Sequence, residues 1–277
     1  MSAERSKIVL SKQEADLQRK AYGPNVFPIF HTMEEKNCLY HFMPIAGLGN
    51  LMNVLKFLII LNDQETSEII LIYIAHDLLN GLNSIHKKRI VHLDLKPENL
   101  LTVNTGISYI SDFGLSIQLD KTVGWNVPGE SVGDENYFSK TRKKAKSKNT
   151  FFDGRKADYY AAGLTLLHFL QLKTDVHELS KKINNPEPQS IQWIVSCLLS
   201  CDTEDSTTPC PVDDLPATLL KSSCFLPLSR SEKIRTEIFS RLRAPQRGSK
   251  IIPLQIENQE TLNETSPLIP YHSRSSS

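Results

Sequence analysis

The 277-residue sequence predicts an α+β fold that is mostly helical, with a few short strands. Between Ser67 and Lys87, apolar residues recur at intervals of three and four, which predicts a long amphipathic helix. Its apolar stripe consists of Leu71, Ile74, Leu78, Leu82 and Ile85. The segments 99–103 and 108–110 flank the turn Asn104-Thr105-Gly106, a pattern typical of a β-hairpin. Apolar residues form 40% of the chain, which is enough for a sizeable core.

Shorter elements are predicted before the long helix. Residues 38–43 alternate in polarity and indicate a strand that stops at Pro44. The turn-forming sequence Gly47-Leu48-Gly49-Asn50 then introduces a helix over residues 51–58.

The rest of the chain predicts helices followed by a polar tail. A strong helix is expected over residues 157–170, and weaker ones over 175–182 and 190–199. From about Ala244 the composition turns to Pro, Gln, Asn, Ser and Thr, which predicts a disordered tail.

Charge and cysteine content exclude several classes of protein. The chain has 32 Lys and Arg against 31 Asp and Glu, so a net charge of +1 gives no general attraction to nucleic acid. No apolar segment approaches the roughly 20 residues of a membrane span, and no signal peptide is recognisable. The cysteines lack zinc-site spacing and are expected to be reduced, mostly buried thiols of a cytoplasmic protein. They are Cys38, Cys197, Cys201, Cys210 and Cys224.

Two short motifs carry the chemistry. The first is His92-Leu93-Asp94-Leu95-Lys96-Pro97-Glu98-Asn99, and the second is Ser111-Asp112-Phe113-Gly114. They place two carboxylates and an amide at the ends of short strands, with a lysine two residues after the first carboxylate. Phosphoryl transfer needs such groups, because metal ions must be held, a hydroxyl proton accepted and developing charge neutralised.

These motifs resemble the catalytic loop and the metal-binding motif of the eukaryotic-type Ser/Thr protein kinases. The resemblance implies a bilobal kinase fold with a small, incomplete β-rich N-lobe and a mostly helical C-lobe. It implies that Asp94 is the catalytic base and that Lys96 pairs with the γ-phosphate of ATP. Asn99 and Asp112 would hold Mg²⁺, and the substrate would be a protein with a Ser or Thr hydroxyl.

The resemblance covers residues 12 to 228. It implies that Asp158 supports the catalytic loop and that Glu14 lies at or near the glutamate of the family's C helix. The residues implied around the adenine of ATP are Met43, Ile45, Ala46 and Leu101.

The expected domains follow from the same comparison. Residues 1–44 would be a remnant N-lobe with the C helix and two strands, and residues 45–228 the C-lobe. Residues 229–277 would form a C-terminal extension, disordered from about 244.

The sequence also departs from the family. Thirteen residues precede Glu14, and no G-x-G-x-x-G motif, the family's lid over the ATP phosphates, occurs near it. Residues 6–10 could form a shortened strand with Lys7 as the phosphate lysine, or Lys7 could be an exposed basic residue. Leu93 stands where many kinases have an arginine that binds a phosphorylated activation loop, so activation by such a phosphate is not expected.

The segment 140–148 contains six basic residues. One interpretation is a solvated, mobile loop. The others are a docking patch for acidic protein substrates and a nuclear-import signal.

The leading hypothesis is an ATP- and Mg²⁺-dependent Ser/Thr protein kinase. The rival is a pseudokinase or binding scaffold, because the glycine-rich loop is missing, and a third hypothesis is an incomplete kinase chain. A cytoplasmic location is expected, although the serine-rich tail also permits an effector exported into a host cell.

Overall fold

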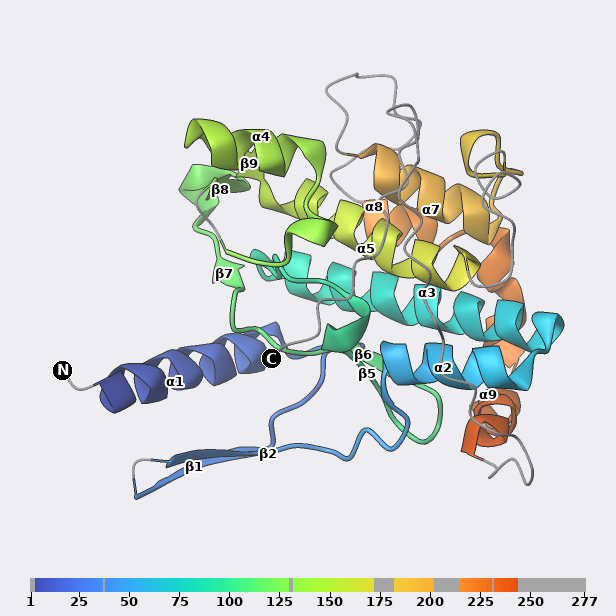
Figure 1. Cartoon of the computed structure of the whole chain (residues 1–277), viewed down its shortest axis with the longest axis horizontal. Helices are drawn as coiled ribbons and strands as arrows, with labels where there is room; N and C mark the ends of the chain where they lie inside the picture. Colours follow the sequence, from blue (N-terminus) through green and yellow to red (C-terminus); the bar gives the residue numbers. More distant parts are fainter. Residues whose placement is uncertain are drawn as a thin grey trace, which may run out of the picture. The chain divides into compact units, whose positions relative to one another are not determined.

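The computed structural model describes residues 3–36, 38–129, 132–171, 182–201, 215–230 and 232–243 (Figure 1). Residues 1–243 form one compact unit. The predicted disordered tail and most of the helix expected over 175–182 lie outside the described residues. The domain boundaries at 44 and 228 stay predictions.

The chain begins with helix α1, Ala3–Ala21, followed by an antiparallel hairpin of β1, His31–Glu35, and β2, Cys38–Phe42. The hairpin runs in register from the pair His31 and Phe42 to the pair Glu35 and Cys38. The strand predicted over 38–43 is therefore confirmed. The strand considered over residues 6–10 is wrong, because these residues belong to α1. A short apolar run fits either structure, and here the helix continues through it.

The middle of the unit is built around the predicted long helix, α3, Gln64–Lys87. All five residues of its apolar stripe are buried. Helix α2, Leu51–Leu61, precedes it, and Asn50 caps α2 by accepting a hydrogen bond from the Asn53 N–H at 3.2 Å. Figure 1 shows α3 crossing the unit between α2 and α5, Gly154–Gln171.

The predicted hairpin is also confirmed. Strands β5, Leu100–Thr102, and β6, Ser108–Ile110, pair antiparallel, and β3, Gly49–Asn50, adds to the free edge of β5. Two further antiparallel pairs join β4, Ile90–Val91, to β7, Ile117–Gln118, and β8, Asn126–Pro128, to β9, Phe151–Asp153.

The basic segment 140–148 is a helix, α4, Lys140–Lys148, so the loop interpretation is wrong. Ser139 caps its first turn by accepting a hydrogen bond from the Arg142 N–H at 3.2 Å, and Asn149 ends it with a left-handed φ of 50°. Arg142 and Ala145 are buried, whereas the lysines of α4 are exposed. Burial of the narrow face that carries Arg142 and Ala145 therefore stabilises α4 as a helix, although its lysine-rich composition is typical of a solvated loop.

The remaining helices complete the unit. The helix predicted over 190–199 is α7, Ile191–Ser200, which packs on α5. It is followed by α8, Leu215–Leu219, and α9, Glu232–Ser240. Single 3-10 turns are η1, Pro97–Asn99; η2, Lys121–Val123; η3, Glu135–Tyr137; and η6, Arg241–Arg243. The longer 3-10 helix η5 covers Ser223–Arg230.

Four cysteines lie in the described residues, all with free thiols. Cys197 and Cys201 are buried, Cys224 is half-buried and Cys38 is exposed, so the expectation of mostly buried thiols holds for only part of the set. None of the described helices is both long and apolar enough to cross a bilayer.

A buried ion pair anchors α9 to α3. Both amino groups of Arg235 contact the carboxylate of Asp77, with Nη1 and Oδ1 3.1 Å apart. Asp77 Oδ2 also accepts a hydrogen bond from the Ser108 N–H at 2.7 Å, and Arg235 Nη2 donates to the Gly106 carbonyl at 2.7 Å. The pair therefore fastens α9 to the β5–β6 hairpin, which follows Asn99.

We expect Arg235→Met to lower the free energy of unfolding by about 3 kcal/mol, because it leaves the buried Asp77 carboxylate without its cation. Urea denaturation at neutral pH measures this change as a lower midpoint. Arg241→Met, at an exposed arginine of η6, is the control and should leave the midpoint unchanged. Equal midpoints for the two variants would show that the pair contributes nothing net.

Candidate active site

The backbone at His92 and Leu93 is held by one buried carboxylate. Asp158, in α5, accepts hydrogen bonds from the N–H groups of His92 and Leu93, each at 2.8 Å. Its Oδ2 also lies 2.9 Å from Nε2 of His86 in α3. Leu93 has a φ of 67°, a left-handed conformation that is costly for a bulky residue. The bonds to Asp158 help to hold this conformation immediately before Asp94.

His92 joins the two sequence motifs. Its Nε2 lies 3.0 Å from the Ser111 carbonyl, and its ring packs edge to face on Phe113 with centroids 5.0 Å apart. Burial lowers the pKa of His92, although the nearby Asp158 carboxylate opposes this effect. A neutral ring with its proton on Nε2 donates to Ser111 and leaves Nδ1 to accept from the Asp94 N–H, 3.4 Å away. The imidazole therefore links the loop of Asp94 to the residue before Asp112.

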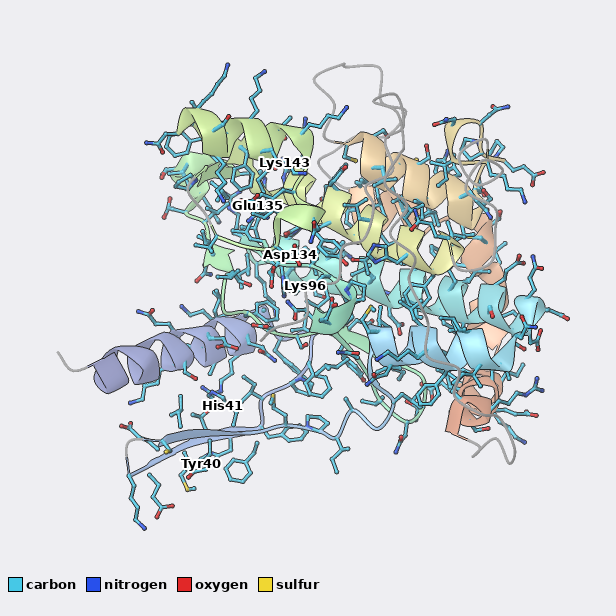
Figure 2. The ribbon with its side chains drawn as sticks, viewed as in Figure 1. Tyr40, His41, Lys96, Asp134, Glu135 and Lys143 are labelled. Atoms are coloured by element: carbon cyan, nitrogen blue, oxygen red, sulfur yellow. The ribbon has the colours of Figure 1, made fainter. Side chains whose placement is uncertain are left out.

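Both carboxylate oxygens of Asp94 are engaged. Oδ2 accepts a hydrogen bond from Nδ2 of Asn99 at 2.9 Å and lies 3.0 Å from Nζ of Lys96. Oδ1 accepts a hydrogen bond from the backbone N–H of Asp134 at 3.2 Å. The Asp94 and Lys96 side chains keep 11% and 22% of their surface exposed, so the pair is not sealed from solvent. Figure 2 shows Lys96 beside Asp134, with Glu135 further toward α4.

Lys96 is held in its charged form. Burial acts to lower its pKa, but the hydrogen bond to Asp94 and the charge of that carboxylate outweigh burial, so the pKa of Lys96 is raised. An ammonium group at this place can neutralise charge that develops on a phosphoryl group.

Asn99 and Asp112 offer oxygen atoms to a cation. The Asn99 amide nitrogen donates to the Asp94 carbonyl at 2.8 Å and to Asp94 Oδ2, which leaves Oδ1 of Asn99 for a metal. The exposed Asp112 lies in the adjoining loop, which is tied to Asn99 because the Ser111 N–H and hydroxyl both donate to the Asn99 carbonyl at 2.9 Å. Amide and carboxylate oxygens fit Mg²⁺, which needs only one or two protein carboxylates when it also binds phosphates. Across the described part of the chain, no group of three or more His, Cys, Asp or Glu could by itself enclose a metal.

Glu14 reaches the second motif from α1. A β-carbon placed on Gly114 would lie 3.7 Å from Glu14 Oε2. Burial raises the pKa of Glu14, and the neighbouring Asp112 carboxylate raises it further. Lys7 lies in the same helix, about two turns earlier. Its side chain is outside the described part of the structure, and its role as the phosphate lysine stays a prediction.

The residues expected around the adenine are more loosely arranged. Met43 is 45% exposed and Ile45 is 85% exposed, whereas Ala46 and Leu101 are partly buried. Pairing of β3 with β5 sets Asn50 opposite Leu101, which brings the segment after Ala46 beside that strand. The structure therefore groups Asp94, Lys96 and Asn99 directly. The adenine-binding role of the second group stays a prediction.

Sequence reasoning missed two groups next to Asp94. One is the backbone N–H of Asp134, which no side-chain motif could reveal. The other is the guanidinium of Arg142, which donates to the Leu93 carbonyl at 2.8 Å. A helical reading of 140–148 would have provided a signal, because Arg142 and Ala145 share one face of that helix.

Comparison with known proteins agrees with the fold and the loop motifs. The family model described as "Protein kinase domain" matches residues 2–226. CBL-interacting protein kinase 11 of Oryza sativa is 30% identical over 155 residues, covering 56% of this chain and 29% of that protein. Serine/threonine-protein kinase CBK1 of Pneumocystis carinii is 32% identical over 111 residues (40% and 21%), and rhodopsin kinase GRK1 of Rattus norvegicus is 31% identical over 126 residues (42% and 19%). The chain thus spans less than a third of the length of these relatives. The match over most of the chain shows that it belongs to the eukaryotic-type protein kinase family.

Proposed function

We propose that this chain transfers the γ-phosphoryl group of ATP to a Ser or Thr hydroxyl of a protein substrate. The observation that carries the proposal is the Asp94 carboxylate, which is oriented through both oxygens and has Lys96 3.0 Å away. The three similar proteins described above carry names of protein kinases, and one is named a serine/threonine kinase. The choice of Ser or Thr as acceptor rests on this similarity and on Lys96.

In this proposal each residue has one task. Asp94 orients the substrate hydroxyl and accepts its proton as the oxygen attacks the γ-phosphorus. Lys96 contacts the γ-phosphate oxygens and neutralises the charge that develops there. Asn99 Oδ1 and Asp112 would hold Mg²⁺, which supplies charge neutralisation on the phosphates when bound. Asp158 and His92 keep these loops in place without touching substrate.

A binding scaffold without catalysis is the second candidate. The first 44 residues carry no G-x-G-x-x-G motif, so the backbone donors with which such a loop cradles phosphates are not provided there. The exposure of Met43 and Ile45 also favours weak nucleotide binding. Docking of acidic substrates on α4, nuclear import, cytoplasmic location and export as an effector stay predictions.

We expect Asp94→Asn to reduce phosphate transfer to a Ser/Thr peptide by about 10²-fold or more, because the general base is lost. The asparagine oxygen can still accept the Asp134 N–H, so thermal stability should change little. Transfer of radiolabelled phosphate and a thermal melt measure the two effects. Asp120→Asn, at an exposed carboxylate, is the control. Undiminished transfer by the Asp94 variant would exclude this residue as the base.

Nucleotide binding separates the kinase from the scaffold. Mg²⁺ and ATP at about 100 times the dissociation constant should raise the free energy of unfolding by about 2.7 kcal/mol. EDTA or Asp112→Asn should remove most of this gain, whereas Asp120→Asn should keep it. If millimolar Mg²⁺ and ATP leave the melting temperature of the unaltered protein unchanged, the scaffold is the better description.

A further inference from the structure

Arg142 is buried directly behind the candidate catalytic loop. It lies in α4 and is 2% exposed. Its Nη1 donates to the Leu93 carbonyl at 2.8 Å, and its Nη2 donates to the Val132 carbonyl at 3.0 Å. The guanidinium also packs on the face of Phe138, 3.6 Å from the ring centroid. One planar side chain therefore contacts two backbone segments that are distant in sequence.

These two segments meet at Asp94. Leu93 immediately precedes Asp94, and Val132 lies two residues before Asp134, whose N–H donates to Asp94 Oδ1 at 3.2 Å. Arg142 thus holds the residue before the candidate base and also the segment that supplies a hydrogen-bond donor to it. A displacement of either segment would turn the Asp94 carboxylate away from an incoming hydroxyl.

The packing around Gly133 shows how closely the segments approach. A β-carbon at this position would lie 3.1 Å from each of three atoms: Arg142 Nη2, the Leu93 carbonyl oxygen and Phe138 Cε1. Gly133 also has a φ of 153°, a conformation that L side chains rarely adopt. A larger residue at position 133 would therefore be strained and would press on the guanidinium and on the Leu93 carbonyl that it contacts.

The contacts leave the guanidinium closed to a phosphate. A phosphate receptor needs an accessible fork of N–H donors. Arg142, in contrast, is buried, and both of its terminal nitrogens donate to backbone carbonyls. Burial lowers the pKa of Arg142 to about 10, opposed by Asp158 and Asp94, so the group stays charged at neutral pH. Leu93 likewise offers no cation to a phosphorylated segment.

We propose that Arg142 is a positioning residue that fastens the segment 132–138 to the catalytic loop, so that no phosphate on this segment is needed for an active geometry. This inference rests on the proposed kinase activity. In other kinases, a phosphate on this segment and an exposed arginine could form such a cross-link only after phosphorylation. Here the buried Arg142 guanidinium links the segment to the catalytic loop at all times.

Arg142→Lys and Arg142→Met test the cross-link. Lysine keeps the charge but lacks the planar fork that spans both carbonyls, and methionine removes the charge. We expect kcat for peptide phosphorylation to fall roughly 10- to 100-fold in both variants, since a small displacement of a catalytic group has an effect of this size. The KM for ATP and the thermal shift with Mg²⁺ and ATP should not change. Arg241→Lys and Arg241→Met, at an exposed arginine, should behave like the unaltered protein. A wild-type kcat in both Arg142 variants would overturn the proposal.

The unaltered protein provides a measurement that does not depend on the folding of the variants. After phosphatase treatment, with removal of phosphate verified by intact mass, kcat should be undiminished. A loss of about tenfold or more, traced by peptide mass spectrometry to a phosphate removed from Tyr137, the one hydroxyl-bearing residue of the segment 132–138, would overturn the proposal.

Amide hydrogen exchange separates this proposal from the proposed function. If the unaltered protein transfers no phosphate, the kinase proposal fails, yet the cross-link still predicts faster exchange over residues 132–138 in Arg142→Lys than in Arg241→Lys. Equal exchange in the two variants would overturn the cross-link itself.

Discussion

The candidate site depends on the buried Asp158 carboxylate more than on any other single group. Removing a carboxylate from water is costly unless its lone pairs are satisfied, and Asp158 meets the N–H groups of His92 and Leu93 and the ring of His86. Because Asp158 sits on α5 and His86 on α3, the packing of these two helices determines where the loop before Asp94 runs. The chemistry of an irregular loop is thereby fixed by the most regular part of the fold.

From Asp158 a chain of hydrogen bonds leads through His92 to Ser111, then to Asn99 and back to Asp94. Each member is fixed by its neighbours, which offsets the cost of the left-handed backbone at Leu93 and Asp112. A closed network of this kind explains why two loops with little regular structure can hold an amide and two carboxylates in defined positions.

The sequence predicted the helices in which apolar residues recur regularly over a long stretch, such as α3 and α5. It also predicted the β5–β6 hairpin with its turn. It also predicted that Asp94, Lys96 and Asn99 lie together, because a motif orders them within six residues. It failed at residues 6–10, where a short apolar run fits both helix and strand. It also failed at 140–148, where helix formation depends on tertiary burial of Arg142 and Ala145. The Asp134 N–H has no side-chain signature at all, so only coordinates could assign it to the site.

The two sides of the candidate site are unequally built. The side that would face the phosphates is densely hydrogen-bonded, and Arg142 fixes it from behind. The side expected to face the adenine includes the exposed Met43 and Ile45, which follow the two-stranded β1–β2 sheet in the chain. Apolar contact with an adenine ring contributes binding energy in proportion to the area removed from water, so exposed residues contribute little until something covers them. Under the proposed function, nucleotide affinity in the described unit should therefore come mainly from the phosphates, through Lys96 and a cation that Asn99 and Asp112 would hold. Discrimination between ATP and other triphosphates should consequently be weak unless a further segment or partner covers Met43 and Ile45.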